Sequence, residues 1–283
     1  MCGITGWAKS DPESLPLAGD EEILRSMCNS MVHRGPDSEG IWLGAGSALG
    51  MRRLSIIDLK TGDQPVWNEE RSVVVVMNGE IYNFKTIRAK LEEKGHTFKT
   101  EGDTEVVPHL YDEYGEEFVE HLNGMFAIAL WDLRQRKLII ARDRFGEKPL
   151  YYGVFGNDLY FASELKVLLT HSKIDPEIDL KALQQYLSYD YVPAPRSIYK
   201  EINKLPAAHT LVWQSGKIST RRYWDLSFDK GPEKIPIAEA SSVLRQKLSD
   251  SVKIRLVSDV PLGVLLSGGI DSSTIAAFAQ HHS

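Results

Sequence analysis

The stretch Met125–Ala141 reads MFAIALWDLRQRKLIIA and contains two apolar segments separated by a mostly polar one. Met125–Trp131 and Lys137–Ala141 are rich in residues that favour strands, and Asp-Leu-Arg-Gln-Arg lies between them. This pattern predicts an antiparallel hairpin. A sheet that begins with a hairpin is built from neighbours in the sequence and does not need the long crossovers of a parallel sheet.

Two further hairpins are predicted downstream. Tyr151–Phe155 and Leu159–Ala162 flank Gly156-Asn157-Asp158, which is a typical turn sequence. Leu211–Trp213 is followed by Ser215-Gly216 and predicts another turn. Other short segments rich in β-branched residues are strand candidates; they are Ile4–Ala8, Ile41–Leu43, Ser55–Asp58 and Val73–Met77.

Helical periodicity occurs between these strands. Apolar residues recur at three- and four-residue spacing in three stripes, which are Ile23/Leu24/Met27/Met31, Phe84/Ile87/Leu91 and Val106/Val107/Leu110/Tyr114. The last two stripes end at Gly95 and Gly115, and a glycine commonly follows the end of a helix. Because hairpins outnumber parallel crossovers, the sequence predicts antiparallel sheets covered by helices, an α+β fold.

The character of the chain changes near residue 226. The polar, turn-prone stretch at positions 229–234 predicts a linker over 226–235, and a helical stripe runs from Ala240 to Val252. Gly263–Leu266 has the composition of a buried strand, and Ser267-Gly268-Gly269 leads into an apolar helix from Ser272 onward. Strand, glycine-rich turn and helix open an α/β domain. We therefore expect a first domain over 2–225 and the truncated start of a second over 236–283.

Composition excludes several classes of protein. The chain has 283 residues and a formal net charge of −6, so it lacks the basic balance typical of proteins that bind nucleic acids or anionic membranes. Its longest apolar runs are far shorter than the ~20 residues of a membrane span, and the first residues do not form a signal peptide. The two cysteines cannot form a disulfide scaffold, so a reducing, cytoplasmic location is expected.

Cys2 directly follows the initiator methionine. Removal of Met1 would leave a residue with both a thiol and a free α-amine, whose reference pKa values are ~8.5 and ~7.7–8.0. An amine that titrates near neutrality can act as the general base for the neighbouring thiol. Such a site needs no separate histidine.

Five short motifs occur in order along the chain, and the first of them contains Cys2. They are Met1–Gly6 (MCGITG), His33–Asp37 (HRGPD), Arg53–Asp58 (RLSIID), Asn78–Asn83 (NGEIYN) and Gly102–Glu105 (GDTE). The set resembles the glutaminase domain of glutamine-dependent asparagine synthetases, which are amidotransferases with an N-terminal cysteine nucleophile. The resemblance covers about residues 2–215 and resumes at Val260–Ser273. It implies an αββα sandwich of antiparallel sheets, the N-terminal-nucleophile fold, followed by the start of an α/β PP-loop domain that binds adenine nucleotide.

The resemblance implies roles for individual residues. Cys2 would be the nucleophile, while the Asn78 amide and the Gly79 N–H would stabilise the oxyanion. Glycine at position 79 would also allow the substrate to approach the backbone. Arg53 would bind the glutamine carboxylate, and Asp103 with Glu80 or a backbone carbonyl would bind its ammonium group. The motif also places Leu54, Ser55, Ile56 and Ile57 at the glutamine site, and Arg34–Asp37 would form a mobile cover.

The second domain carries a candidate nucleotide loop. A glycine turn before a helix offers N–H groups and a helix dipole to phosphate oxygens. By resemblance, ATP would bind here and, with Mg²⁺ placed with help from Asp271, activate aspartate as β-aspartyl-AMP for attack by ammonia. Glutamine hydrolysis itself would need no cofactor, and the histidines show no metal-ligand spacing, so no resident metal is predicted. The ATP-binding residues would be Leu265, Leu266, Ser267, Gly268, Gly269, Asp271, Ser272 and Ser273.

Three functions remain open at this point. The chain could belong to a glutamine-hydrolysing asparagine synthetase, with glutamine, aspartate and ATP as substrates. It could instead come from a related amidotransferase or amide ligase that acts on another carboxylate, including a β-lactam-forming ligase that has lost its glutaminase. It could also be a non-catalytic amino-acid-binding or regulatory module, which would keep Arg53 and Asp103 but would not require a free Cys2 amine. We expect no nucleic-acid or membrane partner and leave a homodimer open. These 283 residues alone are expected to hydrolyse glutamine but make no asparagine.

Overall fold

A computed structural model describes residues 1–229, 231 and 234–283. It divides the chain into two units, and each is described by itself. Unit 1 comprises Met1–Ser55 and Lys60–Asp225; unit 2 comprises Ile56–Leu59 and Leu226–Ser283. Three residues of the predicted linker, at positions 230, 232 and 233, lie outside the described residues.

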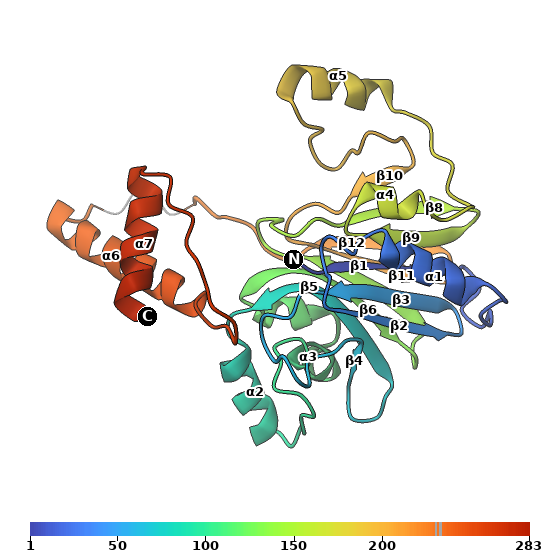
Figure 1. The fold of residues 1–283 in the computed structure, drawn as a ribbon, viewed down its shortest axis with the longest axis horizontal. Helices are drawn as coiled ribbons and strands as arrows, with labels where there is room; N and C mark the ends of the chain where they lie inside the picture. The colour runs from blue at the N-terminus through green and yellow to red at the C-terminus, as the bar shows by residue number, and fades with distance from the viewer. Residues whose placement is uncertain (230, 232–233) are drawn as a thin grey trace. The chain divides into compact units, whose positions relative to one another are not determined.

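Unit 1 contains two six-stranded sheets in which every strand pair is antiparallel. The first sheet has the order β10 (Ile202–Lys204), β8 (Tyr151–Phe155), β9 (Asp158–Ala162), β1 (Gly3–Ala8), β3 (Ser47–Arg53), β2 (Ser38–Gly44). The second has the order β12 (Lys217–Arg222), β11 (His209–Gln214), β7 (Lys137–Arg142), β6 (Gly124–Asp132), β5 (Val73–Ile81), β4 (Val66–Trp67). Figure 1 shows the sheets of this unit stacked face to face.

The main core lies between the two sheets. Alternate residues of each strand point to the same face, and the inward set is apolar along most of each strand. Ile4 and Ala8 of β1 and Val74 and Val76 of β5 belong to this core, together with Trp131 of β6. All five are almost completely buried, so the sheets are held together by a dry apolar layer.

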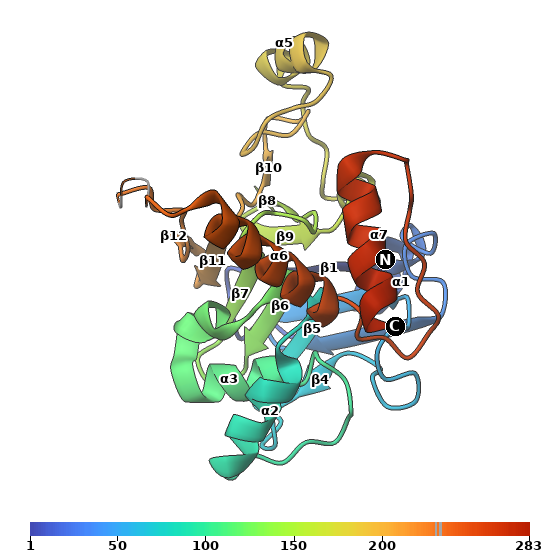
Figure 2. The ribbon, with the colours of Figure 1, turned by 90° about the vertical axis from the view of Figure 1, so that its left-hand side faces the viewer.

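Helices form the outer layers of unit 1. α1 (Asp20–Asn29) and α4 (Leu165–Leu168) cover the outer face of the first sheet and enclose a second apolar cluster that includes Trp7, Leu24 and Met27. On the side of the second sheet, α3 (Val106–Tyr114) contacts β5 and α2 (Phe84–Glu93) contacts α3, as Figure 2 shows. A 3-10 helix, η1 (Gly115–His121), follows α3, and α5 (Leu180–Tyr189) precedes β10. The α+β sandwich of antiparallel sheets is therefore confirmed.

The local predictions have mixed outcomes in unit 1. All three hairpins are confirmed, as β6–β7, β8–β9 and β11–β12. The strand predicted at Ser55–Asp58 is wrong, because β3 ends at Arg53 and the following residues form a loop. The predictions also missed β3 itself, since SALGMRR is not rich in β-branched residues.

The described part of unit 2 consists of two helices and their connections. α6 (Ile237–Ile254) contacts α7 (Ile270–His282), and the Ser249 hydroxyl lies 2.8 Å from Nε2 of His282. The strand predicted at Gly263–Leu266 is wrong: these residues have no regular structure, and Leu265 is 95% exposed. A strand needs a hydrogen-bonded neighbour, and unit 2 supplies none within its described residues. Across the described chain, no helix is both long and apolar enough to cross a membrane.

The contact between β1 and β3 can be tested at Gly6. A Cβ atom there would lie 2.1 Å from the backbone oxygen of Ala48, and backbone cannot move aside as a side chain can. We expect Gly6→Ala to lower the free energy of unfolding of unit 1 by about 1–3 kcal/mol or more, measured by urea denaturation with tryptophan fluorescence. Gly263→Ala is the control, since a Cβ there meets nothing within 4 Å. Equal stability of the two variants would contradict this packing.

Candidate active site

Cys2 directly precedes β1 and lies at the edge of the inter-sheet core. Residues 2, 4 and 8 share one face of the strand, and Cys2 is partly buried against the core that contains Ile4 and Ala8. The Leu54 N–H donates to Sγ of Cys2 at 3.3 Å, and Sγ lies 3.6 Å from the Leu54 carbonyl oxygen. The thiol is thus held by the backbone that directly follows β3.

Arg34 anchors the backbone of Cys2. Its Nε donates to the Cys2 carbonyl oxygen at 2.8 Å, and its Nη1 contacts Oε1 of Glu164 at 3.0 Å. Arg34 is buried, and a Cβ on Gly35 would collide with the Arg52 backbone. Arg34 and Gly35 are therefore packed into unit 1, and the cover expected over Arg34–Asp37 stays a prediction. Pro36 and Asp37 are exposed.

Asn78 carries a buried amide with no hydrogen-bond partner among the described residues. Both its Nδ2 and its Oδ1 are inaccessible and unpartnered, and the residue is 1% exposed. Alternation along β5 places Asn78 on the same face as Val74 and Val76, which is the face toward the first sheet. Since β1 and β5 contact each other, the unpartnered amide and Cys2 belong to the same inter-sheet region.

Gly79 lies inside β5, not in a turn, because the strand continues to Ile81. A Cβ at this position would lie 2.1 Å from the Met125 carbonyl oxygen and 2.6 Å from Cα of Phe126. The backbone of β6 therefore makes the close approach that requires glycine at position 79. The sequence had predicted that the substrate would make this approach. The adjacent Asn78 and Gly79 are paired with Ala127 and Phe126 and are fixed in register.

Two carboxyl groups are buried near each other beside this strand. Burial raises the pKa of Glu80, and the charge of Asp103 raises it further. Burial also raises the pKa of Asp103, although the Ile81 N–H donates to its Oδ2 at 2.7 Å. Oε2 of Glu80 has no hydrogen-bond partner among the residues described. Burial is thus the largest cause of both shifts, and the charges of Lys148 and Arg53 offset the rise in the pKa of Glu80 only in part.

Arg53 ends β3 on the inter-sheet side. Leu49 and Met51 point into the core, and residue 53 has the same parity. Its side chain is buried, and its Nη1 contacts Oδ1 of Asp63 at 3.1 Å. The Arg53 charge favours the ionised forms of both Cys2 and Glu80 and lowers their pKa values, but not enough to overcome burial.

The remaining members of the RLSIID motif are divided between the units. Leu54 contacts the thiol as described above. The Ser55 N–H donates to Oδ2 of Asp37 at 2.8 Å. Ile56 and Ile57 belong to unit 2, where the Ile56 carbonyl accepts from the Asp259 N–H at 2.9 Å. Within unit 1, the structure therefore brings Leu54 together with Cys2.

Lys148 was missed by the sequence analysis. It is 7% exposed, and burial lowers its pKa, while the charges of Glu80 and Cys2 act in the opposite direction. The turn that carries it is built on Asp143, whose carboxylate accepts from the backbone N–H groups of Phe145, Glu147 and Lys148. A lone lysine has no sequence signature, but the Asp-Arg-Phe-Gly-Glu-Lys stretch after a predicted strand could have marked an ordered turn.

Burial shifts both titrating groups at the amino terminus. It raises the pKa of the Cys2 thiol, and the hydrogen bond from Leu54 offsets this only in part. It lowers the pKa of the Met1 α-amino group, and Arg34 and Lys148 lower it further. A thiol with a raised pKa depends on a nearby base to become nucleophilic.

In the candidate nucleotide loop of unit 2, two serine hydroxyl groups contact each other. Oγ of Ser267 lies 2.9 Å from Oγ of Ser272, and Gly268 has a φ of 84°, which favours glycine. α7 starts after Gly269 without a side-chain cap from the described residues. Its first N–H groups and the neighbouring hydroxyls are the donors that a phosphate group requires. The loop therefore fits phosphate, although the strand expected before it is not formed.

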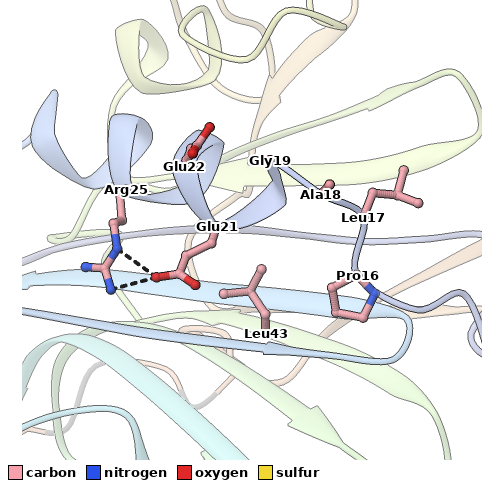
Figure 3. Close-up of a pocket in the computed structure, with 8 residues that line it drawn as sticks. All are labelled: Pro16, Leu17, Ala18, Gly19, Glu21, Glu22, Arg25 and Leu43. Carbon is pink, nitrogen blue, oxygen red and sulfur yellow. Dashed lines mark hydrogen bonds and ion pairs between the residues drawn. The ribbon is translucent and has the colours of Figure 1, made fainter.

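A hollow of about 550 Å³ lies elsewhere in unit 1, between α1 and the β2–β3 region (Figure 3). Its lining includes Pro16, Leu17 and Leu43, and Arg25 hydrogen-bonds to Glu21 at its edge. None of the predicted site residues lines it. The hollow is thus separate from the Cys2 site.

Comparisons with known proteins match both parts of the chain. Residues 1–224 match the family model "Glutamine amidotransferase domain", and residues 243–283 match "Asparagine synthase". Asparagine synthetase [glutamine-hydrolyzing] 1 of Bacillus subtilis is 41% identical over 281 residues, which are 99% of this chain and 44% of that protein. Asparagine synthetase [glutamine-hydrolyzing] 2 of Arabidopsis thaliana is 40% identical over 289 residues, covering 100% and 43%. The chain spans less than half the length of these relatives.

Three other matches carry different names, and two of them have much lower sequence identity. Amidase chry2 of Gibberella zeae is 36% identical over 293 residues, 99% of this chain and 43% of that protein. The glutamine phosphoribosylpyrophosphate amidotransferase of B. subtilis superimposes with a TM-score of 0.54 at 18% identity, covering 99% of this chain and 64% of that one. A structure titled as the allosteric regulatory enzyme of purine biosynthesis gives a TM-score of 0.58 at 17% identity, covering 99% and 63%.

The structural matches support the fold, and the family model covers most of the sequence. Within that match lie Cys2 at the edge of the inter-sheet core and the unpartnered Asn78 amide. The chain therefore belongs to the glutamine amidotransferase domain family, and its residues from 243 onward match the asparagine synthase family.

Proposed function

We propose that unit 1 hydrolyses glutamine to glutamate and ammonia, with Cys2 as the nucleophile after Met1 is removed. The Cys2 α-amine takes the thiol proton, and Sγ attacks the side-chain amide carbon. The amine then protonates the leaving nitrogen, so ammonia departs and a thioester remains. Water attacks the thioester, with its proton taken by the same amine, and releases glutamate and the free thiol.

The observation that carries this proposal is the unpartnered amide of Asn78. A buried polar group without a hydrogen bond costs about 1–3 kcal/mol, so its presence in the same inter-sheet region as Cys2 favours a role in binding charge. In our proposal, Nδ2 of Asn78 and the Gly79 N–H donate to the oxyanion of each tetrahedral intermediate. Their fixed register in β5 means that little reorganisation is needed during the reaction.

In our proposal, charged side chains position the α-carboxylate and the α-ammonium group of glutamine. Arg53 is a buried guanidinium that can bind the α-carboxylate through two hydrogen bonds. Burial raises the pKa values of both Glu80 and Asp103, and a ligand ammonium group beside them would favour their ionised forms. We propose that Asp103, with Glu80, binds the α-ammonium group of glutamine.

We further propose that the ammonia serves an ATP-dependent amidation of aspartate to asparagine. The proposal rests on the asparagine synthetase relatives and on the residues from 243 onward. Ser267, Gly268, Gly269, Ser272 and Ser273 would hold ATP phosphates, Leu265 and Leu266 would lie beside the nucleotide, and Asp271 would help to place Mg²⁺. Residues that would bind the acceptor acid are not identified in unit 2, so ligation of another carboxylate is the second candidate. A cytoplasmic location fits this chemistry.

Two substitutions test the proposed hydrolysis. We expect Cys2→Ala to abolish release of glutamate from glutamine, because no thioester can form. Asn78→Ala should lower kcat by ~10²–10³, the usual loss for one oxyanion donor, with little change in KM. Steady-state assays of glutamate on the 283-residue chain, with folding checked by circular dichroism, measure both effects.

Cys28→Ala is the matched control, since Cys28 is on the buried face of α1 with Leu24 and Met27. It should leave kcat unchanged even if stability falls. Full activity of Cys2→Ala, or an equal loss in Cys28→Ala, would refute the assignment of Cys2.

Arg53 and Arg52 provide a test of substrate binding. Successive strand residues point to opposite faces, so only Arg53 is expected to reach the glutamine carboxylate. Arg53→Ala should raise KM for glutamine by at least about 10-fold, the loss of one charge-assisted pair of about 1.5–3 kcal/mol. Arg52→Ala should change KM by much less. A Michaelis constant that is unchanged in Arg53→Ala would overturn its role as the carboxylate anchor.

A further inference from the structure

Three potential metal ligands meet in unit 1 outside the proposed glutamine site. Glu69 lies in the turn between β4 and β5, His96 lies in the loop after α2, and His109 is in the middle of α3. One ligand atom from each residue can be chosen so that all three lie within 4.8 Å of one another. The fold therefore gathers two imidazoles and a carboxylate from three separate segments.

The two histidines present the same ring nitrogen to the same carboxylate. Nδ1 of His96 lies 3.1 Å from Oε1 of Glu69, and Nδ1 of His109 lies 3.0 Å from Oε2 of Glu69. Oε1 also accepts from the Thr97 N–H at 2.9 Å, which holds the carboxylate in place. Convergence of two imidazole nitrogens on one carboxylate is the arrangement of a two-histidine, one-carboxylate metal site.

His109 supplies an independent observation. It is 1% exposed, and neither of its ring nitrogens has a hydrogen-bond partner among the described residues. The contact of 3.0 Å with Glu69 is close, yet it does not have the direction of a hydrogen bond. Phe98 packs edge-on to the ring with centroids 4.5 Å apart. A buried, unpartnered imidazole is costly, and a cation bound at Nδ1 would satisfy it.

Each histidine also has a second carboxylate on its far side. Nε2 of His96 lies 3.3 Å from Oε1 of Glu113, and Nε2 of His109 lies 3.9 Å from Oε1 of Glu105. Histidine ligands usually direct their second nitrogen toward such a group, which orients the ring. Glu113 also pairs with Lys94, and Glu105 accepts from the backbone of Lys99 and Thr100. These two carboxylates are therefore supports for the rings, while Glu69 is the shared ligand.

We propose that Glu69, His96 and His109 bind a divalent first-row transition-metal cation of the Zn²⁺ type. Two nitrogen ligands favour this class over Mg²⁺ or Ca²⁺, which prefer oxygen. Solvent can complete the coordination, since the Glu69 side chain is 32% exposed and that of His96 is 13% exposed. The cation would join the β4–β5 turn to α3 and to the loop after α2, so its role is to stabilise the outer layer of the second sheet.

Zn²⁺ and Co²⁺ are the probes for the test. The full 283-residue chain carries Cys2→Ser throughout, because a terminal cysteine can itself chelate a metal. Isothermal titration with Zn²⁺ gives stoichiometry and Kd, the thermal midpoint gives stabilisation, and the visible d–d absorption of Co²⁺ reports nitrogen ligation. We expect one saturable site, a rise in the thermal midpoint and a Co²⁺ spectrum.

Glu69→Gln, His96→Gln and His109→Gln should each weaken that site by at least about 10-fold, the lower end of the loss seen even for supporting groups around a metal. His96 is the decisive position, because its partly exposed ring can be replaced without opening the core. His121→Gln is the matched control, since His121 is exposed and stacks on Tyr114 at 3.9 Å. It should bind Zn²⁺ like the parent chain.

Two results would overturn the proposal. The first is the absence of a saturable 1:1 site in the folded parent chain, which would leave the cluster as a hydrogen-bonded network only. The second is equal Kd values for His96→Gln, Glu69→Gln and His121→Gln, which would place the bound metal elsewhere. Circular dichroism of each variant without metal establishes that it is folded, so a loss of binding cannot be a loss of structure.

Discussion

Face-to-face packing of two antiparallel sheets is the constraint on which the rest of unit 1 depends. It divides every strand into an inward and an outward set of side chains. Along most of β1 and β5 the inward set is apolar, with Ile4, Val74 and Val76 in the shared core. At one end of these strands the same inward positions are occupied by Cys2 and Asn78. The polar site is thus a continuation of the core in which apolar residues are replaced by reactive ones.

Because of this packing, polar side chains in the described part of unit 1 are buried without enough hydrogen-bond partners or solvent to stabilise them. The Asn78 amide has no partner among the described residues, and the buried pair Glu80 and Asp103 have raised pKa values. Each such group lowers the stability of the free protein. In the proposed function, these groups would meet a ligand that brings a carboxylate, an ammonium group and a developing oxyanion. The sheets tolerate the cost because their other inward positions are tightly packed.

Much of this arrangement could be predicted from the sequence because it is local. The three hairpins have apolar segments on either side of turn residues, and the five motifs identify Cys2, Arg53, Asn78 and Asp103 in order. The burial of Arg34 under Cys2 could not be predicted, since it depends on a contact across 32 residues. Lys148 was missed because a lone lysine has no sequence signature, so only the fold shows that it is buried.

One other failure has a physical cause that the sequence conceals. The strand at Gly263–Leu266 has the right composition, but the described part of unit 2 offers it no neighbouring strand. The cluster of Glu69, His96 and His109, on which the metal proposal rests, has no signature in the sequence because folding brings its members together from separate elements.

The central claim is that the amine of Cys2 itself is the general base. Its most direct test compares glutamine hydrolysis by two forms of the 283-residue chain whose intact masses differ only by Met1. The account predicts that the form beginning at Cys2 turns over glutamine and that the form retaining Met1 does not, because its amine lies one residue away from the thiol. Equal kcat values for the two forms would contradict the account.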